Sequence, residues 1–324
     1  MTGIPVEELH KIPFLTRRVD AGRLISCLAF YVNGEWHNWI WARNTLVKIR
    51  SWPHEANYFG DRAERDTDQR FLLLELLAQR TLCRSLYPQF HGIWNDFQNL
   101  AASLAKLKMF FHRREDAADG VCRFVQAEIE YIAVVCRSVF DLLQEIVAAH
   151  WDRIQIAGRK NKRKLPSSFA DVIRDGETPR SAKRMQDKYG LLPQLAQWYA
   201  EHAGFLLLIR GLRDSLVHRG ATVELIFVTD RGFAVQKSCA PFADLHEWSC
   251  ESVLPNNLVP LRPVLCRMVQ ATRNACDSFA DVLAKVVQLP EELAPGLKLY
   301  SRGLHDKELS EIDDVVTHSK WCDT

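Results

Sequence analysis

The feature that most constrains the fold is a long stretch without helix breakers. After Gly120, no glycine or proline occurs before Gly158, and apolar residues recur there at helical spacing. The same spacing recurs elsewhere, as at Phe71, Leu74 and Leu77. The pattern predicts a mainly helical, all-α protein. In the first half, breaks such as Asn33-Gly34, Trp52-Pro53 and Tyr87-Pro88 divide the pattern into helices expected near residues 15–32, 35–51, 61–85 and 90–112.

The second half of the chain contains the same helical pattern and one exception. Ser168 and Asp171 can cap a short helix that runs through Ile173, and longer helices are expected near residues 193–218 and 261–288. Residues 180–188 carry a weaker helical pattern. Between the two long helices, the segments T-V-E-L-I-F-V and F-A-V-Q flank the turn T-D-R-G and predict a small β-hairpin near residues 222–237. This is the only β element that we expect.

Composition limits the classes of protein that remain. The 42 basic and 40 acidic residues nearly balance, so overall charge does not indicate a nucleic-acid partner, and 47% hydrophobic residues suffice for a large core. The nine cysteines form no C-x-x-C pair, so we expect neither a metal site nor a cofactor. The N-terminus lacks the pattern of a signal peptide, and no uncharged run reaches membrane-spanning length. A cytoplasmic protein that does not enter a membrane is expected.

The segment L-I-R-G-L-R-D-S-L-V-H-R-G, residues 208–220, carries the most chemical information. It ends an apolar helix with Arg213, Asp214 and His218, and Gly220 supplies a helix-terminating residue. A chain of this composition contains about one Arg–His pair at this spacing by chance. The information therefore lies in the context, which is the end of a long apolar helix with an acidic residue directly after the arginine.

This motif resembles that of the HEPN superfamily, helical bundles whose nuclease members carry Arg, a polar residue, three further residues and His at the end of a core helix. The preceding segment A-E-I-E-Y-I-A-V-V-C-R-S-V-F-D-L-L-Q-E-I-V is similar to the bundle helix that packs against the motif. The resemblance implies a HEPN-like helical bundle over residues 115–290 with the hairpin inserted. A helical N-terminal region, 1–114, would precede it, and a polar tail, 291–324, would follow.

The resemblance implies a metal-independent endoribonuclease of the kind found in toxin–antitoxin and antiviral defence systems. His218 would take the proton of a ribose 2′-hydroxyl, and Arg213 would stabilise the charge that grows on the phosphate. Asp214, four residues before His218, can orient its imidazole. Five residues advance a helix by about 140°, so Arg213 and His218 diverge. The family implies a homodimer in which two motifs meet, with RNA as substrate and an inhibitor or antitoxin protein as a possible further partner.

Other polar residues admit two interpretations. Glu130 and Asp141 either support Arg213 or belong to a solvated helix face. The basic run of Arg159, Lys160, Lys162, Arg163 and Lys164 is either an RNA-backbone contact or a solvated or nuclear-targeting loop. The tryptophans of G-E-W-H-N-W-I-W-A-R are interpreted as core or interface residues of a helix. Two further functions remain open: a non-catalytic dimerising or RNA-binding module, and an unrelated helical scaffold.

Overall fold

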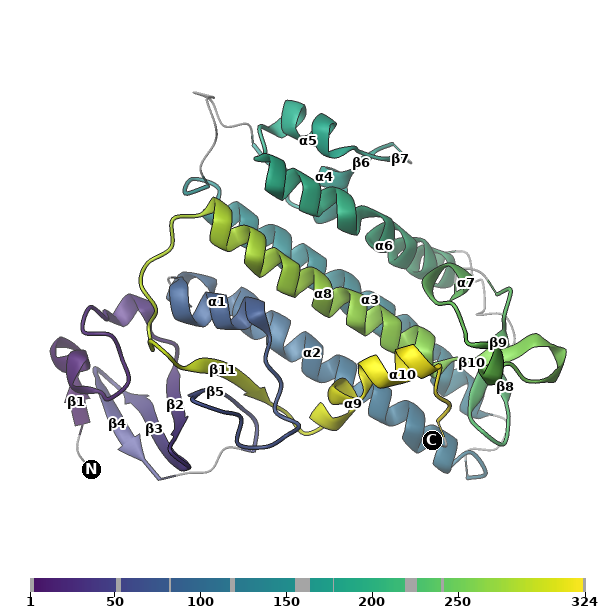
Figure 1. Ribbon diagram of the computed structural model, residues 1–324, viewed down its shortest axis with the longest axis horizontal. Coiled ribbons are helices and arrows are strands. Elements are labelled where there is room, and N and C mark those ends of the chain that lie inside the picture. The colour runs from purple at the N-terminus through teal and green to yellow at the C-terminus, as the bar shows by residue number, and fades with distance from the viewer. Residues whose placement is uncertain are drawn as a thin grey trace.

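The protein is a mixed α/β structure, so the all-α prediction is wrong. The computed structural model describes residues 3–50, 54–81, 83–116, 120–154, 164–176, 178–218, 226–239 and 242–322, without the side chains of 83–84 and 213–218. A six-stranded sheet lies against one side of a bundle of long helices, and two small sheets lie farther along the molecule (Figure 1).

The large sheet has the strand order β1-β4-β3-β2-β5-β11. Its neighbours are antiparallel except for β2 and β5, which run parallel through the pairs Phe30↔Phe59 and Tyr31↔Gly60. Five strands come from the first sixty residues and the sixth from the C-terminal part of the chain. The strands are β1 Gly3–Pro5, β2 Cys27–Val32, β3 Glu35–Ala42, β4 Thr45–Ile49, β5 Ala56–Gly60 and β11 Lys298–Arg302, with the 3-10 helices η1 Val6–Lys11 and η2 Ala21–Arg23 among them.

The helices expected at 15–32 and 35–51 are therefore strands for most of their length. Asn33 and Gly34 both have positive φ, 54° and 82°, and form a two-residue turn that joins β2 to β3. Along β3, Trp39 is buried while its neighbour Ile40 is exposed, as the alternation of a strand requires. The interpretation of these tryptophans as residues of a helix is wrong, although Trp39 is a core residue as expected. In the strand, Trp39 and Ile40 point to opposite faces of the sheet.

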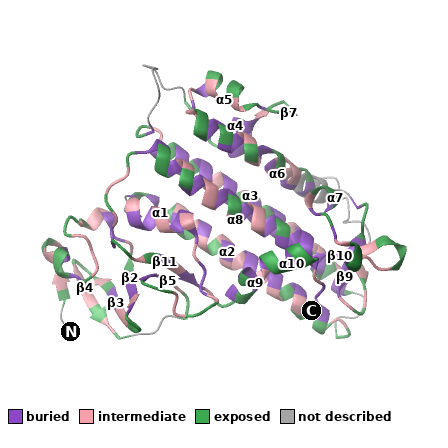
Figure 2. Ribbon diagram, in the orientation of Figure 1, coloured by how far each residue is buried: buried purple, intermediate pink, exposed green. Residues whose placement is uncertain are grey.

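Four long helices form the bundle and bury most of its apolar residues (Figure 2). Helix α3 contacts α2, α6 and α8, and so occupies the middle of the group. The predicted long helices of the second half are confirmed, and so is the helix expected at 90–112, which begins earlier, at Cys83, and has Pro88 inside it. The helix expected at 61–85 is wrong in its bounds, since a short helix covers only residues 72–80 there. The four long helices are α2 Cys83–His112, α3 Val121–His150, α6 Pro193–His218 and α8 Arg262–Val286, and the short helix α1 Leu72–Arg80 precedes them.

Shorter elements connect the long helices. Ser168 caps α4 as predicted, because its Oγ accepts a hydrogen bond from the Asp171 amide at 3.2 Å. The predicted hairpin is present: β8 pairs with β9, and β10 adds a third strand. Residues 219–225, at the start of the expected hairpin region, lie outside the described residues. The connecting elements are α4 Phe169–Ile173, β6 Arg174–Asp175, β7 Thr178–Pro179, α5 Ala182–Tyr189, β8 Phe227–Val228, β9 Phe233–Gln236, α7 Phe242–Leu245, η4 Cys250–Ser252, η5 Pro255–Asn257 and β10 Leu258–Pro260.

The segment 291–324 is an integral part of the fold and not the expected polar tail. Its strand β11 pairs with β5, and helices α9 Asp306–Ser310 and α10 Ile312–His318 pack on α2 and α8. Leu309, Ile312 and Val315 are buried there. Lys108 of α2 contacts both Glu308 and Glu311 at 2.8 and 2.9 Å, so ion pairs add to this apolar packing.

Candidate functional site

The Arg–His motif lies at the C-terminal end of α6. This helix contacts α3, α4, α5 and α8, so the backbone that carries the motif is packed on several sides. Arg213, Asp214 and His218 occupy its last described turns, and residues 219–225, which follow, lie outside the described structure. The side chains of these three residues lie outside the described part of the structure. The helix geometry separates Arg213 and His218 by about 7.5 Å along the axis.

Helices α3 and α6 are antiparallel, and two contacts fix their register. The Tyr199 hydroxyl donates to Gln144 Oε1 at 2.5 Å, and the rings of Phe140 and Phe205 lie 6.0 Å apart. A step of four residues forward in α3 thus corresponds to a step of six residues backward in α6. Since the axial rise is about 1.5 Å per residue, Arg213 lies about 12 Å beyond Phe205.

This register separates the two carboxylates that were predicted to support the motif. Glu130, half-buried on α3, lies within about one turn of the level of Arg213. Asp141 lies about nine residues from that level, or roughly 14 Å along the axis. Its carboxylate instead faces Arg137 of the same helix, with an Nε–Oδ2 distance of 4.0 Å. The backbone arrangement thus brings Glu130, and not Asp141, to the motif end of α6.

A described counterpart of the Asp214–His218 spacing occurs in α10. There Asp314 precedes His318 by four residues at the end of the helix, and His318 Nδ1 lies 2.9 Å from Asp314 Oδ1. The residue before this aspartate is Asp313, where the motif has Arg213. The α10 pair shows that an Asp and a His at this spacing can meet at a helix end, where Lys320 also pairs with the aspartate.

The basic loop contributes little described structure. Lys164 is exposed, and Arg159, Lys160, Lys162 and Arg163 lie outside the described residues. The loop connects α3 to α4. In the described ranges, no group of three or more His, Cys, Asp or Glu side chains has an arrangement that could hold a metal ion.

Cysteine side chains in the bundle are packing residues. Cys136, Cys266 and Cys276 are buried, and burial raises the pKa of Cys136 and of Cys266 to about 12. The neutral thiol is therefore the stable form at physiological pH, and such a thiol is a poor nucleophile.

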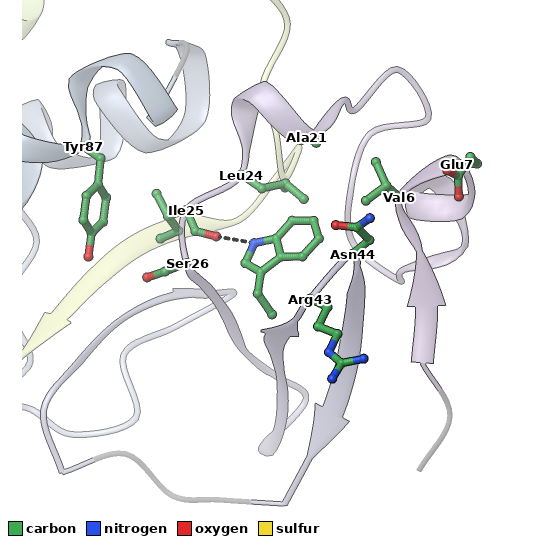
Figure 3. Close-up of a pocket in the computed structure, with 10 residues that line it drawn as sticks. Val6, Glu7, Ala21, Leu24, Ile25, Ser26, Arg43, Asn44 and Tyr87 are labelled. Atoms are coloured by element: carbon green, nitrogen blue, oxygen red, sulfur yellow. Dashed lines mark hydrogen bonds between the residues drawn. The ribbon is translucent and has the colours of Figure 1, made fainter.

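A cavity that the sequence interpretation missed opens beside the large sheet. Its volume is about 670 Å³, and its walls come from η1, from the segment around η2, from the β3–β4 turn and from the start of α2 (Figure 3). Trp41 lines it and donates its indole N–H to the Ile25 carbonyl at 3.1 Å. The only available signal was the turn residue pair Arg43-Asn44, which the helical interpretation of 35–51 concealed.

Among the described helices, none combines the length and apolar character that crossing a bilayer demands. No family model, no curated protein and no solved structure matches this chain.

Proposed function

We propose that this chain is a metal-independent endoribonuclease of the HEPN type, with Arg213 and His218 as its catalytic residues. The observation that carries the proposal is the position of the motif L-R-D-S-L-V-H in the last described turns of α6, a bundle helix packed against α3.

The chemistry follows from the two side chains. His218 removes the proton of a ribose 2′-hydroxyl, and the 2′-oxygen attacks the adjacent phosphorus. Arg213 binds the phosphate oxygens, on which negative charge grows as the bond forms. The bond between phosphorus and the 5′-oxygen then breaks, and the 5′-oxygen takes up a proton. The products are a 2′,3′-cyclic phosphate and a 5′-hydroxyl. DNA lacks the attacking hydroxyl and is not cleaved.

Two carboxylates assist in this proposal. Asp214 orients the imidazole of His218, as Asp314 contacts His318 in α10. Glu130 lies at the level of Arg213 on the neighbouring helix, and a carboxylate there would hold the guanidinium through a charge-assisted hydrogen bond. Asp141 has no part in the proposed site because of its distance along α3.

A homodimer belongs to the same proposal. Arg213 and His218 point about 140° apart around the helix axis, and one motif supplies no second acid for the 5′-oxygen. The motif of a second chain, related by a twofold axis, would supply both the missing acid and a second cation. Phosphate contacts from the basic loop that includes Lys164 would bind the RNA backbone without sequence preference.

The test is cleavage of a mixed RNA by the purified chain in EDTA. Arg213→Ala and His218→Ala should each reduce the rate by about 10²-fold or more, because each removes a group that acts in the transition state. His318→Ala is the matched control, since it deletes a helix-terminal histidine with the same aspartate spacing but no preceding arginine. Cleavage by either motif variant at the wild-type rate would contradict the proposal. So would an activity that EDTA abolishes.

A further inference from the structure

The cavity beside the large sheet has the composition of a ligand site. Leu24, Ile25 and Val6 supply an apolar wall, and the partly buried indole of Trp41 adds an aromatic surface. The volume of about 670 Å³ falls within the range of small-molecule sites, about 300–1,000 Å³. An apolar cavity of this size, with a few polar groups at its edge, is the usual form of a binding pocket.

Four polar side chains at this cavity are uncommitted. Glu7, Ser26, Arg43 and Asn44 line it, and none of them forms a side-chain hydrogen bond or ion pair with any described residue. They come from three separate segments of the chain (Figure 3). Trp41 differs, because the Ile25 carbonyl already accepts its N–H. The Trp41 ring can therefore contact a ligand only through its faces and its edge, and not as a hydrogen-bond donor.

The backbone of Arg43 is the second unusual feature. Arg43 has φ of 57°, in the left-handed region, at the tight turn that Ala42 and Thr45 close by pairing. A residue with a side chain pays about 1 kcal/mol for this conformation, and glycine would avoid that cost. Arg43 lines the cavity with an exposed side chain, whose guanidinium extends away from the indole in Figure 3 and would have to turn inward to reach a ligand. Strained residues of this kind cluster at binding sites.

The cavity also continues toward α2. An adjoining hollow of about 240 Å³ shares Ile25, Ser26 and Tyr87 with it. Trp94 of α2 lines that hollow, and its buried Nε1 has no hydrogen-bond partner in the described structure. A buried donor without an acceptor is uncommon in folded proteins, so a ligand or water acceptor is expected there.

We infer that this cavity binds a nucleoside monophosphate. A base stacks on an indole face without needing a particular sequence, and the Asn44 amide can both donate to and accept from a base edge. Arg43 pairs with the phosphate, and Glu7 accepts hydrogen bonds from ribose hydroxyls. The inference does not depend on the nuclease motif, since Figure 1 places the large sheet away from β8, which follows α6 in the chain.

A free aromatic amino acid is the chief competing ligand, because Glu7 and Arg43 could pair with its two charged groups. The lining groups argue against it. A single amino acid would leave the Asn44 amide unused, whereas base, ribose and phosphate together use the aromatic surface, the amide and the guanidinium at once. This competitor gives the test a specific negative result.

The test is calorimetric titration of the intact chain, carrying His218→Ala so that no cleavage interferes. The probes are AMP, GMP, CMP and UMP, the matching nucleosides, and free tryptophan. At least one monophosphate should bind more tightly than its nucleoside and than tryptophan. Arg43→Gly should weaken monophosphate binding about tenfold or more and nucleoside binding less than about twofold. It keeps the left-handed turn, so the fold should survive. Trp41→Leu should weaken both ligands.

Arg17→Gly is the control, since Arg17 is an exposed arginine that does not line the cavity. Three results would overturn the inference. They are no monophosphate binding at millimolar concentration, equal loss of monophosphate and nucleoside in Arg43→Gly, and tighter binding of tryptophan than of every nucleotide. None of these bears on RNA cleavage, which is measured on the chain with His218 intact.

Discussion

Two buried carboxyl groups, one beside the sheet and one in the bundle, have opposite electrostatic environments. Asp68 accepts from Arg302 at 3.0 and 2.7 Å and from the Tyr58 hydroxyl at 2.6 Å. Burial by itself would raise the pKa of Asp68, but these hydrogen bonds and the Arg302 charge bring it below its usual value. Beside the sheet, Asp68 is therefore a fully paired buried charge.

Asp96, on α2 in the bundle, lacks such a partner. Burial raises the pKa of Asp96 to about 6, although a hydrogen bond with Ser138 acts in the other direction. Its Oδ2 is buried without a hydrogen-bond partner in the described structure. The comparison teaches that burial of a carboxylate does not decide its effect on stability. At neutral pH, the ionised and paired Asp68 stabilises the folded state, whereas the ionised and unpaired Asp96 destabilises it.

The largest effect on the free energy of unfolding is expected when the Asp68 carboxylate loses its cationic partner, Arg302. Arg302 is 2% exposed, joins β11 to Asp68 and Glu64, and lies over the rings of Trp36 and Tyr58. Arg302→Met should lower the free energy of unfolding by about 3–5 kcal/mol, because it leaves a buried carboxylate uncompensated. Urea unfolding at pH 7 measures this loss.

The effect of pH on this loss of stability follows from the lowered pKa of Asp68. The folded-state pKa of Asp68 is depressed, so its ionic contribution is present above the unfolded pKa and disappears as the pH falls through the folded pKa. The deficit of Arg302→Met should therefore shrink in acid. Arg18→Met is the control, because the Arg18 side chain is 83% exposed and its ion pair with Glu291 should contribute less than about 0.5 kcal/mol. Equal losses in the two variants would remove the distinction between buried and exposed pairs.

The next effect has the opposite sign and concerns the unpaired carboxyl. The folded pKa of Asp96 is about 6 and its unfolded pKa about 3.9, so folding stability falls as the pH rises through this window. Asp96→Asn should match the wild type at pH 4 and exceed it at pH 8 by about 1–2 kcal/mol, a value reduced for partial solvent access. Thermal unfolding at several pH values measures the difference.

Asp141→Asn is the matched control for this measurement. Asp141 lies on the neighbouring helix α3, and its side chain is 42% exposed opposite Arg137. Its replacement should change stability by no more than about 0.5 kcal/mol. If Asp96→Asn were destabilising at pH 8, the carboxylate would have a partner outside the described residues, and the contrast with Asp68 would not hold.

The same two regions differ in how far the sequence predicted them. Helix α3 and helix α8 were predictable because their apolar period continues for twenty-five residues or more, which no strand can imitate. Strands β2 and β3 are short, and in a short window Leu24 and Leu28 fit a helix as well as Leu28 and Phe30 fit a strand. Asn33-Gly34 is the strongest hairpin signal in the region, yet it was interpreted as a break between helices.

Other features depend on contacts distant in the sequence. Strand β11 pairs Tyr300 with Tyr58, and no local pattern in residues 298–302 predicts that partner. That the motif lies on a long helix could be predicted, since the helical period defines it locally; the predicted helix end at Gly220 lies outside the described residues. That Glu130 lies at the level of Arg213 could be known only from the register of α3 against α6, which the sequence does not show. The cavity needed four segments brought together, so Trp41, Arg43 and Tyr87 could not be joined from sequence.

The smallest effect isolates hydrogen bonding from charge within the bundle. Tyr199 and Gln144 are fully buried, and the Tyr199 hydroxyl donates to Gln144 Oε1 at 2.5 Å. The Gln144 amide also donates to the Pro166 carbonyl at 2.8 Å, so it stays in place when the tyrosine changes. Tyr199→Phe should cost about 1 kcal/mol, the usual value for losing one buried neutral hydrogen bond. Burial raises the pKa of Tyr199 still further above neutrality, so the loss should be the same at pH 5 and pH 8. Tyr131→Phe, at a tyrosine that is 39% exposed, should change stability by less than about 0.5 kcal/mol. If the cost of Tyr199→Phe varied between pH 5 and pH 8, the titration of Asp96 would be coupled through α3 to the Tyr199–Gln144 hydrogen bond. This neutral pair would then no longer be a valid reference for the charged groups.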